Sequence, residues 1–316
     1  MDRRTLLKTF GIGIPALAGM PLAARRAAGE EAATPAPASG ALGATIHTYQ
    51  SPPTGFFVNA YLVEMPAGGG VVDGTLTVSD SRALRAKLEA TGKPLLAVLV
   101  THPHPDHYAG VAGVVAGDAV PVVATASVDR IIRRDDAAKE QVIGGILGAE
   151  WPANRMFPNQ TLADWESVTF GDVAFTLRDT GAGESGADTY WTAPALPGVV
   201  FTGDLISPFL DAYNADGFSG RWLEKLDRLE RDLGGAALLY PGHGGAATPA
   251  ALAWQRRYLE PLRETVRALA NGQPTLTDAQ KAEAKQRLDE FVPDQRLEFF
   301  VDFSLDAVAK ELADSG

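Results

Sequence analysis

The hydrophobic pattern of residues 44–126 predicts several strands and one helix. Short apolar or alternating runs at 45–50, 55–65 and 68–76 are divided by proline and glycine, which is typical of antiparallel strands. Residues 79–92 begin with Ser/Asp cap candidates, place Leu84 and Leu88 on one helical face and end at a glycine, so they predict a helix. The continuous apolar runs PLLAVLV and AVPVVAT predict two buried strands.

The rest of the chain repeats this alternation of strands and helices. Its expected elements are a helix at 126–147, a hairpin at 167–180 that turns at Gly171 and Asp172, two strands within 189–206, a helix at 220–233, a buried strand within 235–245 and helices from about Pro249. The stripe formed by Trp222, Leu226, Leu229 and Leu233 is expected to face the core. Two similar halves of this kind predict helices that cover a pair of sheets.

The first residues form a segment of a different kind. Arg3 and Arg4 precede a short apolar run from Phe10 to Ala24, and small residues follow. This segment resembles a twin-arginine signal, and its run is shorter than the ~20 residues that a membrane anchor, the alternative, requires. We expect residues 1–28 to be a cleaved signal read by the twin-arginine export machinery, which makes the mature protein periplasmic or secreted without stable membrane insertion. An Ala/Pro/Gly-rich stretch at 29–43 then predicts a flexible leader.

Composition narrows the kinds of chemistry that are available. The 316 residues are 46% hydrophobic and 21% charged, as in an ordinary globular protein. The formal net charge of −11 and the lack of a long basic run argue against nucleic acid as a partner. Because the chain has no cysteine, disulfides, thiolate nucleophiles and thiolate metal sites are excluded. A metal site here must use histidine, aspartate and glutamate.

The stretch THPHPDHYAG at residues 101–110 holds three of the five histidines and follows a predicted buried strand. On extended backbone His102 and His104 point the same way and can hold one ion, whereas Asp106 and His107 come where the chain must turn. Prolines at positions 103 and 105 disfavour helix, so we expect the segment to stay extended. The pattern predicts a metal site at the end of the strand.

The stretch HPHPDH resembles the HxHxDH signature of the metallo-β-lactamase superfamily. The resemblance continues in VVDGTL with Asp73, FTGDL with Asp204 and YPGHG with His243, and it spans about residues 45–245. It implies an α/β fold, the four-layer αββα sandwich, with a dinuclear site at one edge between the sheets. We therefore expect a domain at 44–248 and a helical extension at 249–316, which is a lid, a dimer contact or a packed addition.

The same resemblance implies the ligands. His102 and His104 match ligands of the first metal; Asp106, His107 and His243 match the second; Asp204 matches the bridging carboxylate. The third histidine of the first metal is missing, and Glu184 stands in its place within Gly183-Glu184-Ser185. Asp188 is an alternative to Glu184 as this ligand. A further possibility is that neither residue binds the first metal.

This ligand set implies two divalent ions, with zinc expected. Because a glutamate adds negative charge, the bound water should be less acidified, and the harder ions manganese and iron should compete better than usual. The implied reaction is hydrolysis of a small molecule with an ester, lactone, lactam or sulfate ester bond by a metal-activated hydroxide, with Asp106 orienting it or accepting its proton. Candidate substrate contacts are Tyr108, Asn59 and Tyr213. Two alternatives are a mononuclear iron oxidoreductase acting on sulfur compounds and a non-catalytic binding protein.

Overall fold

This computed structural model describes residues 43–315. The N-terminal half of this part of the chain forms the first sheet. Its strand order is β1-β2-β3-β4-β5-β6; β1 to β3 pair antiparallel and β3 to β6 pair parallel. The strands are β1 (Thr45–Gln50), β2 (Asn59–Met65), β3 (Gly68–Val72), β4 (Leu95–Leu99), β5 (Val122–Thr125) and β6 (Gln160–Leu162). The expected signal at 1–28 and all but the last residue of the leader at 29–43 lie outside the described residues.

The second sheet follows in the order β11-β10-β9-β8-β7, antiparallel except for the parallel pair of β10 and β11. Its strands are β7 (Ser167–Phe170), β8 (Val173–Gly181), β9 (Asp188–Thr192), β10 (Val199–Gly203) and β11 (Leu238–Pro241). The turn between β7 and β8 falls at Gly171 and Asp172, as the sequence predicts.

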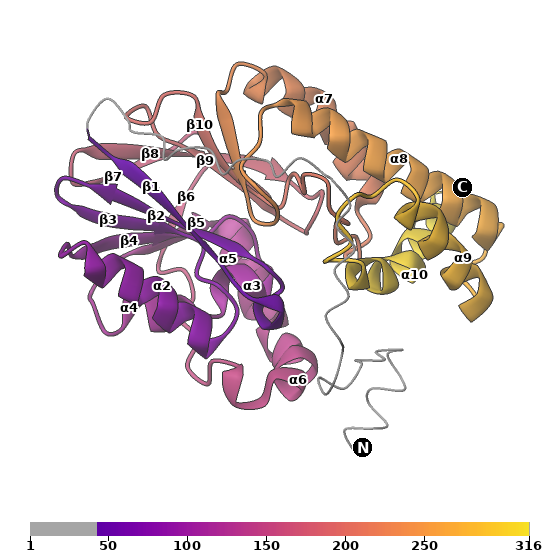
Figure 1. The fold of residues 1–316 in the computed structure, drawn as a ribbon, viewed down its shortest axis with the longest axis horizontal. Coiled ribbons are helices and arrows are strands. Elements are labelled where there is room, and N and C mark those ends of the chain that lie inside the picture. The colour runs from indigo at the N-terminus through magenta and orange to yellow at the C-terminus, as the bar shows by residue number, and fades with distance from the viewer. Residues whose placement is uncertain (1–42, 316) are drawn as a thin grey trace, which may run out of the picture. The chain divides into compact units, whose positions relative to one another are not determined.

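Helices cover the outer face of each sheet (Figure 1). On the first sheet these are α2 (Val78–Ala90), α3 (Pro105–Tyr108), α4 (Val111–Val115) and α5 (Ala126–Lys139), which continues as the π-helix η2 (Glu140–Gly144) and α6 (Gly145–Leu147). On the second sheet they are α7 (Ser219–Leu233) and α8 (Ala250–Ala270), and α9 (Asp278–Asp289) and α10 (Phe299–Asp314) pack against α8. Short 3-10 turns are η1 (Pro53–Gly55) and η3 (Gly148–Glu150). No helix among the described residues is long and apolar enough to cross a membrane.

Three clusters of buried side chains correspond to the three interfaces of a four-layer sandwich. One lies between the sheets and includes Val63, Phe175 and Phe201. A second joins the first sheet to its helices, and a third joins the second sheet to α7–α10. Each large apolar side chain buried in such a cluster contributes about 1.5–3 kcal/mol to stability. The arrangement confirms the predicted αββα fold.

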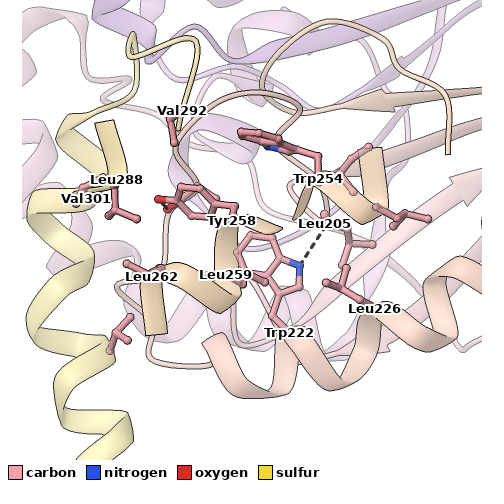
Figure 2. Close-up of a cluster of buried hydrophobic side chains, with 14 of the residues drawn as sticks. Leu205, Trp222, Leu226, Trp254, Tyr258, Leu259, Leu262, Leu288, Val292 and Val301 are labelled. Carbon is pink, nitrogen blue, oxygen red and sulfur yellow. Dashed lines mark hydrogen bonds between the residues drawn. The ribbon is translucent and has the colours of Figure 1, made fainter. Parts of the chain in front are cut away.

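The C-terminal helices pack into the same core as the second sheet. The predicted stripe of α7 is buried, and it shares a cluster with Tyr258 of α8, Leu288 of α9 and Val301 of α10 (Figure 2). The Trp222 indole N–H donates to the carbonyl of Leu205, 3.1 Å away, and so ties this core to the chain just after Asp204. These contacts agree with a packed addition, and the roles of a lid and of a dimer contact stay predictions.

Helix α2 begins earlier than expected. Its N-cap is Thr77, whose hydroxyl accepts a hydrogen bond from the backbone N–H of Asp80, 3.0 Å away. The predicted cap candidates at 79–81 lie inside the first turn instead, where an aspartate also favours a helix start.

Candidate metal centre

The histidine loop follows β4 and changes conformation in the middle. His104 is extended, with φ −81° and ψ 144°, and Pro105 then takes the first position of the helical turn α3. The expectation of an extended segment is therefore wrong beyond His104. Proline is well suited to the first helical position, because its fixed φ fits the helix and its missing N–H has no helical partner there. The turn brings His107 beside the extended pair, with its ring centroid 4.0 Å from that of His102.

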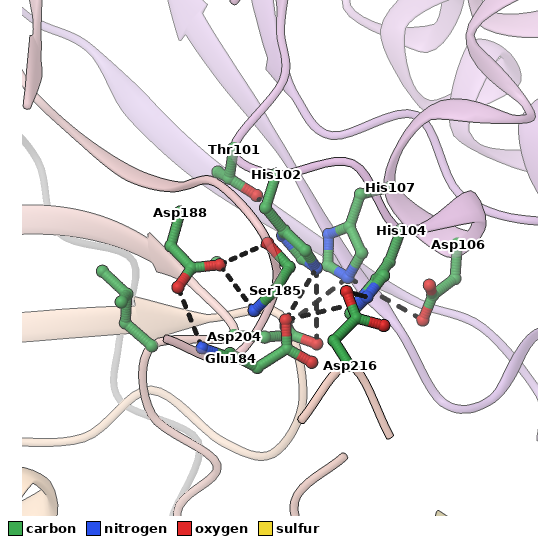
Figure 3. Close-up of polar contacts among 12 residues, drawn as sticks. Thr101, His102, His104, Asp106, His107, Glu184, Ser185, Asp188, Asp204 and Asp216 are labelled. Carbon is green, nitrogen blue, oxygen red and sulfur yellow. Dashed lines mark hydrogen bonds and ion pairs between the residues drawn. The ribbon is translucent and has the colours of Figure 1, made fainter. Parts of the chain in front are cut away.

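The first group of donors consists of His102, His104 and Glu184, all buried. Glu184 Oε2 lies 3.6 Å from His102 Nε2 and 3.2 Å from His104 Nδ1. Figure 3 shows the glutamate beside the two imidazoles, although it comes from the loop between β8 and β9. The structure thus brings Glu184 to the place expected of the missing histidine.

The second group consists of Asp106, His107 and His243, which are also buried. His243 follows β11 and places its Nε2 3.2 Å from Asp106 Oδ2, while His107 Nε2 lies 3.8 Å from the same oxygen. Asp204, just after β10, lies between the groups. One of its oxygens is 3.8 Å from His102 Nε2 and 3.4 Å from His243 Nε2, and the other is 3.4 Å from His107 Nε2. Asp204 therefore lies between the two groups, where the sequence resemblance leads us to expect a shared carboxylate.

Asp188, the alternative ligand, has a different task. Its carboxylate accepts hydrogen bonds from the backbone N–H groups of Glu184 and Ser185, both at 2.9 Å, and from the Ser185 hydroxyl. It also pairs with the buried Lys225 ammonium of α7 at 3.0 Å. Figure 3 shows Asp188 on the far side of the loop from the imidazoles. Asp188 therefore fixes the loop that carries Glu184 and does not join the donors.

Asp73 supports the histidine loop from beneath. Its carboxylate accepts from the backbone N–H of Thr101 at 2.9 Å and from the Thr101 hydroxyl at 2.9 Å. It also accepts from His107 Nδ1 at 2.8 Å, which leaves Nε2 directed at the other donors. A carboxylate on the far nitrogen of a ligand histidine fixes its tautomer and raises its basicity. The sequence resemblance picked out Asp73 without assigning it this role.

The loop that carries His243 is held by close packing. Asn59 donates through its side-chain amide to the carbonyls of Pro241 and Gly244, at 3.0 and 2.7 Å. A Cβ added to Gly242, which follows β11, would clash with Asp204 Oδ1, so only glycine allows the chain to approach Asp204 this closely. Asn59 thus holds this loop in place through two hydrogen bonds. It is not among the residues that line the pocket described next.

A small pocket opens onto His104, Asp106, Glu184 and Asp204. The remaining lining residues are Phe56, Pro105, Lys139, Ile143, Tyr213 and Phe300. The Tyr213 ring lies edge-on to His104, with centroids 5.0 Å apart, and Phe300 contacts both Tyr213 and His243. Tyr213 is placed as the sequence suggests, whereas Phe300 belongs to α10 and had no local signal pointing to it.

The structure does not bring Tyr108 to this pocket. Its side chain is buried in the core beneath the first sheet, and its hydroxyl donates to Asp136 at 3.0 Å. The expectation of a substrate contact is corrected here, because successive residues of the turn α3 point in different directions. Asp216, which was not expected at the site, lies 3.3 Å from His104 Nε2. It stands in a loop without a recognisable motif.

The donor set fits divalent metal ions. Several buried polar atoms at its centre have no hydrogen-bond partner: His102 Nε2, His107 Nε2, both carboxylate oxygens of Glu184 and Asp204 Oδ1. Buried polar groups are normally satisfied, and imidazole nitrogens with carboxylate oxygens are ligands that zinc and similar ions prefer. Burial raises the pKa of Glu184 to about 8, against the opposing effect of His104, so a nearby cation would help to keep it ionised. Burial also lowers the pKa of His102, which favours the neutral ligand form.

Residues 53–243 match the sequence model of the metallo-beta-lactamase superfamily. Because this match covers more than half of the chain, the protein belongs to that superfamily and is one of its metallo-hydrolases. No curated protein matches the chain.

Solved structures share the fold. A metallo-beta-lactamase from Pontibacter korlensis superposes with a TM-score of 0.56 at 19% identity, over 69% of this chain and 94% of that one. The FIM-1 metallo-beta-lactamase from Pseudomonas aeruginosa in the mono-zinc form gives 0.52 at 18% identity, over 69% and 91%. The sec-alkylsulfatase Pisa1 from Pseudomonas sp. gives 0.60 at 19% identity, over 83% of this chain and 48% of that one. The match to the sec-alkylsulfatase covers 83% of this chain, which is more than residues 1–243 make up. It therefore includes part of the C-terminal helices that follow His243.

Proposed function

We propose that this protein hydrolyses an ester, lactone, lactam or sulfate ester of a small molecule at a dinuclear metal centre. The observation that carries the proposal is the convergence of two groups of donors on Asp204, whose oxygens lie 3.4 Å from the second group and 3.8 Å from the first. Each group supplies two imidazoles and one carboxylate. Together with Asp204, this gives the ligands for two divalent ions, for which zinc is the expected identity.

Bound at these residues, two divalent ions would supply an activated water at neutral pH and stabilise negative charge on the reacting oxygens. The chain's own contribution is to hold the donors and to move a proton. Asp106 lines the pocket, so its carboxylate can orient the attacking water or accept its proton. The aromatic rings of Tyr213 and Phe300 close the pocket wall and limit the access of bulk water.

The range of substrates follows from the fold relatives and the pocket. Solved structures that share the fold carry the names of β-lactamases and of a sec-alkylsulfatase, so a lactam and a sulfate ester both belong on the list of candidates. A mononuclear iron oxidoreductase, the alternative raised by the sequence, would not need Asp106, His107 and His243 as a second buried group. Their convergence favours hydrolysis at two ions.

We also infer that residues 1–28 direct export by the twin-arginine machinery, so that the enzyme acts in the periplasm or outside the cell. The support is the sequence pattern around Arg3 and Arg4. The mass of the protein recovered from the periplasmic fraction tests this inference, since loss of the leading residues is expected and a full-length cytoplasmic product would contradict it.

A screen of metal-loaded protein against lactone, β-lactam, phosphate ester and sulfate ester substrates tests the reaction. We expect turnover of at least one class, with about two ions per chain by mass spectrometry. His102→Ala should lose activity by at least about a thousandfold, because a ligated ion contributes several kcal/mol to the transition state. Activity that survives in this variant would overturn the mechanism.

A further inference from the structure

One wall of the pocket carries a cation that the metal centre does not use. Apart from the proposed ligands, the pocket is lined by aromatic and aliphatic side chains and by Lys139. Among the described lining residues, Lys139 is the single lysine or arginine. A substrate that reaches the donors therefore passes an ammonium group set in an otherwise apolar wall.

Lys139 is half-buried and has no ion-pair or hydrogen-bond partner within residues 43–315. The described lysines 93, 225, 281, 285 and 310 each pair with a carboxylate. Lys87 is also unpaired, but it is exposed. Lys139 Nζ is not among the buried atoms without a hydrogen-bond partner, so the ammonium retains contact with solvent and can bind an anion that enters the pocket.

Two carboxylates, Asp216 and Asp135, lie close enough to Lys139 to interact with its charge. Asp216 contacts His104 and Asp135 pairs with Arg134, and neither is within ion-pair distance of Lys139.

The backbone around Lys139 is unusual. Helix α5 ends at Lys139, and the next five residues, Glu140–Gly144, form a π-helix. Ile143 from this π-helix lines the same pocket. Such wider turns are rare and occur frequently at functional sites, where they change the direction of side chains. The irregularity lies where the helix meets the pocket, as expected if it positions Lys139 and Ile143 for a ligand.

The charge of the proposed centre explains why a separate cation is useful. Two divalent ions bring four positive charges, and the carboxylates of Asp106, Glu184 and Asp204 remove three. A third histidine in place of Glu184 would have left a larger positive charge. The centre therefore attracts an anionic substrate weakly, and Lys139 supplies a positive charge at the pocket wall.

We propose that Lys139 binds an anionic group of the substrate while Phe56 and Phe300 contact its apolar part. The preferred substrates are then amphiphilic anions, in which the anionic group is presented to Lys139 and the scissile bond to the metal centre. Phe56 and Phe300 lie with ring centroids 6.3 Å apart on the same wall. This inference rests on the proposed function and adds the class of substrate to it.

Calorimetry on the metal-loaded protein provides a test that does not depend on turnover. The probes are 4-phenylbutyrate and 4-phenylbutyramide, which share an apolar body and differ in charge. We expect the acid to bind about tenfold more tightly than the amide, as for a hydrogen bond to a charged group, and Lys139→Met to abolish the difference. Lys139→Arg should retain it, and Phe300→Ala should weaken both probes alike.

Lys87→Met is the matched control, because Lys87 is also the basic residue in the last turn of its helix and lies outside the pocket. It should leave both affinities unchanged. If Lys139→Met does not fold, Lys139→Glu provides the same comparison and should reverse the preference. An acid that binds equally well to wild type and to either variant would overturn the proposal.

Kinetics separates this inference from the proposed function. For the substrate class that the protein hydrolyses, Lys139→Met should raise KM about tenfold for a derivative with a carboxylate, leave kcat intact and leave a neutral analogue unaffected. Absence of hydrolysis in wild type would remove the proposed function. Hydrolysis with equal KM values in wild type and variant would remove the role of Lys139 alone.

Discussion

The first group of donors, His102, His104 and Glu184, and the second, Asp106, His107 and His243, each contain two imidazoles and one carboxylate. The glutamate makes the two groups chemically alike, since a third histidine would have given the first group no carboxylate of its own. Their supports differ. In the second group His107 donates to the buried Asp73, whereas in the first His104 contacts Asp216 in a loop.

The donors determine which ion each group prefers. The residues that hold the donors in place determine how much change around each group is tolerated. Equal donor sets predict similar preference for the same ion, so one metal should fill both. Because His107 is held by the buried Asp73 and His104 contacts Asp216 in a loop, we expect the second group to tolerate less change around it. The following variants test each part.

The largest effect is expected from removing the carboxylate of one group. Glu184→Ala should reduce the bound metal from two ions to about one and lower kcat/KM about a thousandfold, because one ion and its share of transition-state stabilisation are lost. Asp106→Ala is the matched change in the second group and should have the same stoichiometry. Elemental analysis of the purified variants measures the bound metal. Two ions per chain in Glu184→Ala would show that Glu184 is not needed to bind the first ion.

Glu184→His tests how the charge of the first group affects the centre. It should retain two ions, while the site gains one unit of positive charge. A more positive site acidifies water more strongly, so the acidic limb of the kcat profile should move to lower pH. An acidic limb at the same or a higher pH would show that Glu184 does not set the charge of the centre.

A smaller effect is expected from Asp73→Asn. The change leaves the shape of the support but removes its charge, so His107 loses a carboxylate partner at 2.8 Å and metal affinity should fall about 10- to 100-fold. A competition titration with a chelator measures this loss. An affinity within a factor of two of wild type would mean that packing alone holds the second group.

The smallest effect is expected from Asp216→Asn, the corresponding change in the first group. Its carboxylate is 25% exposed and 3.3 Å from His104 Nε2, against 2% exposure for Asp73. Solvent screens the more exposed contact, so metal affinity should fall less than about tenfold. The same titration applies, and a loss larger than that of Asp73→Asn would reverse the ranking of the two supports.

The sequence predicted the layers and most of the donors because those features are local. Alternating and continuous apolar runs indicate strands whatever lies across the core, and the crowded histidines stand in one short loop. Glu184 was found through an absence, since a histidine was expected at its place. The choice between Glu184 and Asp188 required the structure, because only the direction of each side chain separates them.

Other features could not be predicted because they depend on direction and distance. Tyr108 adjoins the motif in sequence, yet the turn α3 directs it into the core. Phe300 looks like one more apolar residue of an amphipathic helix, and its contact with His243 arises only when α10 packs against α8 and α9. Asp216 and Lys139 carry no motif, so their roles emerge only from what lies beside them.

Phe300 has a consequence for how this enzyme diversifies. The superfamily match ends at His243, but a wall of the pocket comes from a helix that begins more than fifty positions later. Mutations in that distal helix can therefore reshape selectivity while every ligand stays unchanged, so chains with identical catalytic motifs need not share a substrate.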